Sequence, residues 1–225
     1  MLEMDVRLSA DGEVVVIHDA TVDRTTDGTG AVRDLPWAAL RELDAGYRFL
    51  GLDGTPSFRG TGVRLSRFEE ILETFPRTRL NVESKTAEAA APLCRLIERH
   101  SATHRVLLAA QWERDRKDAR GYRGPWGASR EQVAAFRLIP GWRPRADILQ
   151  VPEHFKGWPL VTPAFVRRAH RRNIPVQVWT VNDPADMRRL LEWGVDGIQS
   201  DRPDVLAAVL TEVAGRAPAP GAGAS

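Results

Sequence analysis

The stretch Leu2-Glu3-Met4-Asp5-Val6 decides the fold of this 225-residue chain. Apolar and acidic side chains alternate along it, which is the period of a β-strand with one buried face. The stretch Leu80-Asn81-Val82-Glu83-Ser84-Lys85 repeats the pattern. We expect the apolar face of both strands to lie under a layer of helices, so that the charged side chains point to the opposite side of the sheet.

Similar β-branched runs alternate with helical patterns along the rest of the chain. The predicted strands are Leu2–Val6, Glu13–His18, Leu80–Lys85, Val106–Ala110, Ile148–Val151, Pro175–Val181 and Gly197–Asp201, with a weaker one near Gly121–Trp126. The predicted helices are Leu65–Phe75, Thr86–His100, Ser129–Leu138, Thr162–Arg172 and Asp183–Trp193. This alternation predicts βα units and a parallel sheet.

One connection is too short for a crossover helix. The dipeptide Asp11-Gly12 between the first two strands is typical of a two-residue hairpin turn. With that turn, Ala10 pairs with Glu13, and the register places His18 opposite Asp5 on the same face of the sheet.

Composition limits the class of protein. The chain has 32 basic and 30 acidic residues, 43% apolar residues and 28% charged residues, so the sequence is that of a globular protein. The balanced charge gives no footprint for nucleic acid or for an anionic membrane, and no apolar run is long enough to span a membrane. A single cysteine, Cys94, rules out an intramolecular disulfide and a multi-cysteine zinc site. The Ala/Pro/Gly-rich tail 214–225 is predicted to be disordered, which leaves one domain over residues 1–213.

The charged side chains of the predicted strands indicate a possible catalytic site. Three carboxylates, those of Glu3, Asp5 and Glu83, together with His18 and Lys85, are typical of a divalent-metal site beside a proton-transfer group and an anion site. The alternative is that the acidic residues are merely solvated and the histidine is structural. The apolar opposite faces of both strands favour the metal site.

Several motifs, in order, resemble the glycerophosphodiester phosphodiesterase family. They are Leu2-Glu3-Met4-Asp5-Val6-Arg7-Leu8-Ser9-Ala10-Asp11-Gly12, Val16-Ile17-His18-Asp19, Arg24-Thr25-Thr26-Asp27-Gly28-Thr29-Gly30, Leu80-Asn81-Val82-Glu83-Ser84-Lys85, Leu149-Gln150-Val151-Pro152, Val178-Trp179-Thr180-Val181-Asn182 and Gly194-Val195-Asp196-Gly197-Ile198-Gln199-Ser200-Asp201-Arg202-Pro203. The resemblance covers residues 2 to about 210.

The resemblance implies an α/β fold of the TIM (β/α)₈ barrel type, with a small insertion at about Leu43–Val63. It also implies hydrolysis of a small-molecule glycerophosphodiester to glycerol 3-phosphate and an alcohol, in glycerophospholipid metabolism, with bound Mg²⁺ or Ca²⁺. Matched motif by motif, the metal ligands would be Glu3, Asp5 and Glu83, a catalytic histidine would be His18, the phosphate would be held by Lys85, and a wall of the pocket would be Trp179.

The chain departs from the family pattern at its start. The family opens with a His-Arg-Gly strand end and a Pro-Glu-Asn-Thr helix start, and neither occurs in this sequence. Seven parallel strands are predicted, so we expect one βα unit of roughly 30 residues to be missing from the barrel. Either Met1 is an internal methionine of a longer native chain, or the barrel is catalytically silent and binds only metal or phosphate. The headgroup alcohol, the oligomeric state and the compartment are left open, with the cytoplasm as the default.

Overall fold

The computed structural model describes residues 1–119 and 121–215, and the Ala214 side chain is not described. The chain divides into two compact units, residues 1–130 and 131–225, which we describe separately. Most of the predicted disordered tail lies outside the described residues, and the single domain over residues 1–213 stays a prediction.

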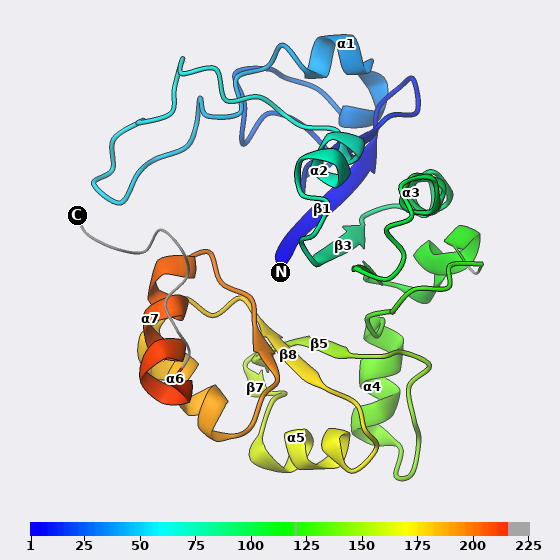
Figure 1. Ribbon diagram of the computed structural model, residues 1–225, viewed down its shortest axis with the longest axis vertical. Coiled ribbons are helices and arrows are strands. Elements are labelled where there is room, and N and C mark those ends of the chain that lie inside the picture. The colour runs from blue at the N-terminus through cyan, green and yellow to red at the C-terminus, as the bar shows by residue number, and fades with distance from the viewer. Residues whose placement is uncertain (120, 216–225) are drawn as a thin grey trace. The chain divides into compact units, whose positions relative to one another are not determined.

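The first unit is built on a four-stranded sheet of order β2-β1-β3-β4 (Figure 1). Its strands are β1 (Leu2–Leu8), β2 (Val14–Val16), β3 (Leu80–Ser84) and β4 (Val106–Ala110). The pairs β1–β3 and β3–β4 are parallel, as the alternating pattern predicts, and β2 returns antiparallel to β1.

Helices cover one face of this sheet. The helical elements of the unit are η1 (Val32–Asp34), α1 (Trp37–Leu40), α2 (Phe68–Thr74), α3 (Ala87–Arg99) and η2 (Glu113–Ala119). Leu80 and Val82 of β3 are fully buried in one core with residues of α2 and α3, and Met4 packs against that core. The prediction of an apolar face under a helix layer is therefore confirmed for both strands that carry the acidic residues.

The predicted hairpin register is wrong by one residue. Val6 pairs with Val16, and the closing backbone bond joins Ser9 N to Glu13 O, so the loop holds three residues instead of two. The Asp11 carboxylate accepts hydrogen bonds from Ser9 Oγ and from the backbone N of Trp37, which draws Asp11 out of the tight turn. His18 is consequently not opposite Asp5; it follows β2 and lies outside the strand.

The second unit has a three-stranded parallel sheet of order β5-β8-β9 and a small hairpin, β6-β7. Its elements are α4 (Arg130–Leu138), β5 (Leu149–Pro152), β6 (His154–Phe155), β7 (Trp158–Pro159), α5 (Pro163–His170), β8 (Val176–Trp179), α6 (Pro184–Glu192), β9 (Gly197–Ile198) and α7 (Pro203–Ala214). The side chains of Thr162 and Asp183 cap α5 and α6, as their sequence positions predict.

The barrel itself is not closed. Within the described residues the parallel strands form two separate sheets rather than one ring. The predicted weak strand near Gly121–Trp126 is reduced to a single parallel bridge between Leu108 and Trp126. The structure thus shows βα architecture in each unit, and the described residues form no closed barrel.

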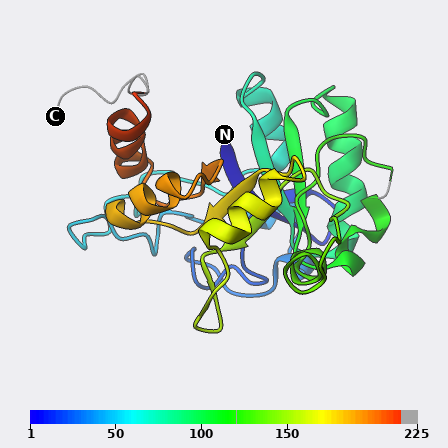
Figure 2. The same ribbon diagram turned by 90° about the horizontal axis from the view of Figure 1, so that it is seen from below.

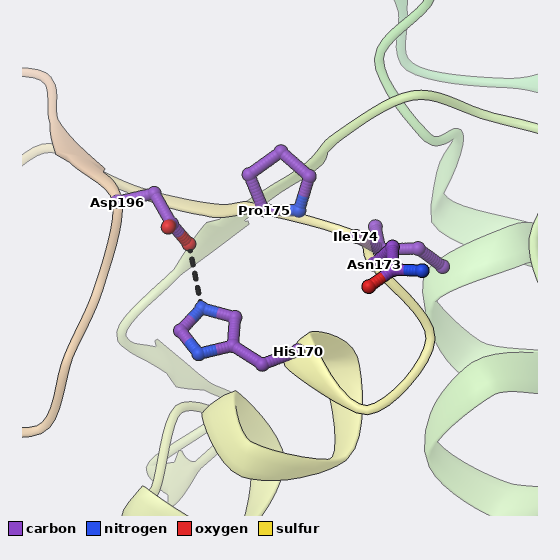
Figure 3. A pocket seen from close by; sticks show the side chains of 5 residues that line it. All are labelled: His170, Asn173, Ile174, Pro175 and Asp196. Atoms are coloured by element: carbon purple, nitrogen blue, oxygen red, sulfur yellow. Dashed lines mark hydrogen bonds and ion pairs between the residues drawn. The ribbon is translucent and has the colours of Figure 1, made fainter.

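A shallow pocket of about 230 Å³ lies at the start of β8 in the second unit, lined by His170, Asn173, Ile174, Pro175 and Asp196 (Figure 3). His170 Nε2 lies 2.8 Å from Asp196 Oδ2, and the same oxygen accepts the backbone N–H of Val176. This contact joins the end of α5 to the start of β8. Active sites of βα folds lie at the opposite, carboxyl-terminal end of the strands, so we assign this pocket a structural role.

Candidate active site

The parallel pairing of β1 with β3 brings the acidic side chains together. Asp5 is directly paired with Glu83, and Glu3 is paired with Asn81. Directly paired residues share a face of the sheet, so all four side chains lie on the face opposite the helices. The alternation within each strand predicts this face, Asn81 included, and the register between the strands pairs Asp5 with Glu83.

Lys85 lies between two of the carboxylates. Its Nζ is 3.0 Å from Asp5 Oδ1 and 3.1 Å from Glu83 Oε1, and its side chain is only 16% exposed. Burial alone would lower the pKa of Lys85, but the charges of Glu83 and Asp5 outweigh burial, and the pKa is raised. Lys85 therefore remains a cation, held at the carboxyl end of β3.

Negative charge is in excess around the Lys85 ammonium. The pKa of Glu3 is raised to about 7, first by partial desolvation and then by repulsion from Asp5 and Glu83. Asn81 is buried, and its Oδ1 has no hydrogen-bond partner among the described residues. Crowded carboxylates beside an unpartnered amide oxygen fit a hard divalent cation, which takes ligands of these two types.

His18 is held by its neighbour in the sequence. Its Nδ1 is 2.6 Å from Asp19 Oδ1, and Arg24 binds both oxygens of the Asp19 carboxylate. The hydrogen bonds from Arg24 and then from His18 lower the pKa of Asp19 well below its usual range. An ionised Asp19 accepts the Nδ1 proton, which leaves Nε2 of the exposed ring as the atom that can exchange a proton with a ligand.

Arg7 is a residue of this site that the sequence reasoning did not single out. It lies on β1 two residues after Asp5, and its Nε donates a hydrogen bond to the backbone O of His18 at 2.9 Å. Asp5 also helps to hold the chain next to His18 in place, because the backbone O of Asp5 accepts the N–H of Ile17. The signal was present in the odd-numbered positions of the strand, where Arg7 follows Glu3 and Asp5.

Trp179 belongs to the second unit. It is the last residue of β8, where it pairs with Pro152 of β5 and is partly buried. It thus lies at the carboxyl end of a parallel strand, as Glu83 and Lys85 do in the first unit. The structure brings together Glu3, Asp5, Glu83 and Lys85, and Trp179 is a separate feature of its own unit.

A second group of potential ligands lies on the helices of the first unit. Atoms of Glu69, Glu73 and His100 are within 4.8 Å of one another. Glu69 already accepts from His100 Nε2 at 3.1 Å and from Arg99, so the group is explained as a contact between α2 and α3. Cys94 is buried on α3, and burial raises its pKa to about 12, which is typical of an unreactive thiol.

Comparison with known proteins identifies the family of the chain. The model of the Glycerophosphoryl diester phosphodiesterase family matches residues 1–124 and 126–205. The chain belongs to this family. Its members are hydrolases that act on phosphoric diesters, and the family resemblance found in the sequence motifs is confirmed.

Relatives of the chain carry the same name. It is 33% identical over 221 residues to the Probable glycerophosphodiester phosphodiesterase 2 of Mycobacterium tuberculosis, covering 93% of this chain and 78% of that protein. It is 29% identical to the Glycerophosphodiester phosphodiesterase of Caldanaerobacter subterraneus, covering 91% of this chain and 83% of that one.

Solved structures of the family share the fold. A glycerophosphodiester phosphodiesterase from Agrobacterium tumefaciens matches with a TM-score of 0.74 and 26% identity over 92% of this chain and 85% of that one. An Oleispira antarctica phosphodiesterase, solved in complex with the product sn-glycerol-3-phosphate, matches with a TM-score of 0.75 and 23% identity over 92% and 83% of the two chains. These similarities support a TIM-barrel-like α/β fold for this chain.

Proposed function

We propose that the chain hydrolyses glycerophosphodiesters to glycerol 3-phosphate and an alcohol, as part of glycerophospholipid metabolism, with the help of a divalent cation, Mg²⁺ or Ca²⁺. The observation that carries the proposal is the cluster of Asp5, Glu83 and Lys85 at the end of two parallel strands. The family membership and the product bound to the Oleispira antarctica relative support this substrate class.

The proposed cation ligands are Glu3, Asp5 and Glu83. Their crowding, together with the unpartnered Oδ1 of Asn81, is the electrostatic environment that a divalent cation relieves. When bound, such a cation would withdraw charge from the phosphate oxygens and make the phosphorus more open to attack. We propose a small molecule as the substrate. Separately, the described residues contain no helix with the length and hydropathy of a membrane span.

The side chains have distinct proposed roles. The Lys85 ammonium binds a non-bridging phosphate oxygen and opposes the charge that develops there. A water molecule attacks phosphorus and loses a proton to solvent, while the bond from phosphorus to the alcohol oxygen breaks. The Nε2 of His18 gives its proton to that oxygen, and Asp19 stabilises the imidazolium from which the proton leaves. Trp179 packs against the glycerol or the headgroup as part of the pocket wall.

The test is release of glycerol 3-phosphate from glycerophosphocholine by residues 1–225, with Mg²⁺, with Ca²⁺ and with a chelator. We expect activity that the chelator abolishes. We also expect His18→Gln to lower kcat by at least about 10²-fold, the usual contribution of a general acid. Trp179→Ala should raise KM more than it lowers kcat.

Matched controls separate the site from the rest of the protein. His104→Gln removes an exposed histidine near the end of α3, and Glu98→Gln removes an exposed carboxylate of α3. We expect both variants to keep full activity, whereas Glu83→Gln should lose cation binding measured by calorimetry. No activity from folded protein would instead support the silent barrel that the sequence left open.

A further inference from the structure

A segment of the first unit exposes an unusual number of large apolar side chains. It comprises residues 45–64, which we call the insertion segment, and it carries no helix or strand. Both views show it (cyan) as a long loop that extends away from β1 and α2 (Figures 1 and 2). Five exposed apolar residues occur in it: Phe49, Leu50, Leu52, Phe58 and Val63.

The base of the segment is firmly built. The buried Asp44 carboxylate accepts the backbone N–H groups of Gly46 and Gly60, and Asp44 N donates to Asp27. Gly46 packs so closely on the backbone of Phe58 that a side chain at Gly46 would collide with it. These contacts fix the loop, so the exposure of its apolar residues is a property of a defined conformation.

Two leucines at a turn are the most exposed apolar residues of the segment, and we call Leu50, Leu52 and this turn the tip. Leu52 is 86% exposed and Leu50 59%, beside a turn in which Gly51 N donates to Thr55 O at 2.8 Å. The rings of Phe49 and Phe58 meet edge to face with centroids 5.2 Å apart. Several large exposed apolar side chains in one short segment favour a binding surface, because water solvates them poorly.

Arginines accompany this tip. Arg48 adjoins Phe49, Arg59 adjoins Phe58, and Arg64 adjoins Val63. Backbone oxygens accept from all three: Thr26 O from Arg48, Tyr47 O from Arg59 and Glu42 O from Arg64. Among the residues that the structure describes, none of these arginines has an ion pair with a carboxylate, so their positive charge is not neutralised within the protein.

Exposed leucines and phenylalanines with arginines next to them in the sequence combine the two kinds of side chain that bind a bilayer surface. Leucine and phenylalanine partition into the boundary between headgroups and acyl chains, and arginine binds the phosphates at the headgroup level. The segment holds three arginines against a single exposed carboxylate, Asp53, and this excess favours a negatively charged partner.

We propose that the insertion segment docks the protein on an anionic phospholipid bilayer. The base of the segment is hydrogen-bonded to Asp27 through Asp44 N, and both the segment and the carboxylate cluster belong to residues 1–130. Membrane binding and hydrolysis are separate properties, and each is measured without the other.

The test is co-sedimentation of residues 1–225 with vesicles of phosphatidylcholine, either pure or with one third phosphatidylglycerol. We expect binding to the anionic vesicles, and at least a tenfold loss of binding in the variant L50S/L52S. Removing one arginine, as in Arg59→Gln, should weaken binding about fivefold, the fold-change that corresponds to about 1 kcal/mol per cation at an anionic surface.

The matched control is L138S/I139S, which removes an exposed apolar pair from the second unit. It should bind vesicles like the unchanged chain. Hydrolysis of soluble glycerophosphocholine should be equal in L50S/L52S and the unchanged chain, and circular dichroism checks that both variants fold. Equal binding to neutral and anionic vesicles would overturn the proposal. So would unchanged binding of L50S/L52S, or a dimer that dissociates on L50S/L52S substitution.

Discussion

Lys85 holds the carboxylate cluster together at the level of single residues. Replacing it with the similarly sized methionine leaves Asp5 and Glu83 facing each other without a cation. Breaking a largely buried ion pair from one side costs about 3 kcal/mol or more. We expect Lys85→Met to lower the unfolding free energy by about that amount in urea titrations.

The Asp5 carboxylate provides the control for this prediction. In the double variant K85M/D5N one negative charge is removed along with the ammonium, so the loss should be smaller than in Lys85→Met alone. Equal stability of Lys85→Met and the unchanged protein would show that these contacts contribute nothing.

Asp19 predicts a pH dependence of stability. The pKa of Asp19 is lower in the folded protein than in the unfolded chain, where it is about 4. The stability that the ionised carboxylate adds to the fold is therefore fully present above about pH 4 and is lost as the pH falls towards the folded-state pKa. Asp19→Asn should therefore be less stable than the unchanged chain at pH 6, and the difference should shrink towards pH 2. Unfolding titrations at several pH values measure this, and a difference that grows on acidification would contradict it.

Among the elements, the hairpin of β1 and β2 shows how far the sequence can predict local structure. Both strands and their pairing follow from the alternation and from Asp11-Gly12. The register does not, because Asp11 binds the backbone of Trp37, 26 residues further along the chain. A turn motif reports only local preference, and a long-range hydrogen bond of this kind is not visible in it.

The three-residue hairpin loop makes its own prediction. Gly12 has a φ of +84°, and a Cβ added there would meet no atom within 4 Å. The cost of Gly12→Ala is therefore backbone strain alone, about 1 kcal/mol. Gly12→Asn should cost less, because asparagine tolerates positive φ. Thermal unfolding of the two variants checks the order, and an alanine variant as stable as glycine would contradict the loop geometry.

In the second unit, Asp196 connects the end of helix α5 with the start of strand β8. One of its oxygens accepts both from His170 and from the backbone N–H of the buried Val176. Asp196→Ala leaves that N–H without its partner at the start of β8, at a cost of about 1–3 kcal/mol. His170→Ala removes only the partly exposed partner and should cost less. A His170 variant that is the less stable of the two would show that the side-chain pair matters more than the strand.

At the scale of the molecule, the sequence predicts the βα order but not the sheet connections. The helix α7 (Pro203–Ala214) was not predicted, although Pro203 at its start and Gly215 at its end are helix signals. The predicted strand Gly197–Asp201 reaches only to Ile198. The candidate site was predictable because the side chains of each of its two strands alternate, which also places Arg7 and Asn81 on the same face, whereas the pairing of Asp5 with Glu83 required the register between the strands.

Cation binding also predicts how the two units unfold. A cation at about 100 times its Kd stabilises the folded state by about 2.7 kcal/mol. In a chain of this size each kcal/mol raises Tm by about 2–4 °C. The proposed ligands all lie in residues 1–130. Cation binding therefore stabilises residues 131–225 only if the whole chain unfolds as one domain.

Because the family model runs through both units, we expect a single domain and a single transition. Hydrogen exchange measured by mass spectrometry, with Mg²⁺ or Ca²⁺ and with a chelator, should show protection gained in β8 as well as in β3. Glu83→Gln is the control, and it should abolish the gain in both strands. If the cation protects β3 and leaves β8 unchanged, the chain consists of two independently unfolding units, and the single domain predicted over residues 1–213 is wrong.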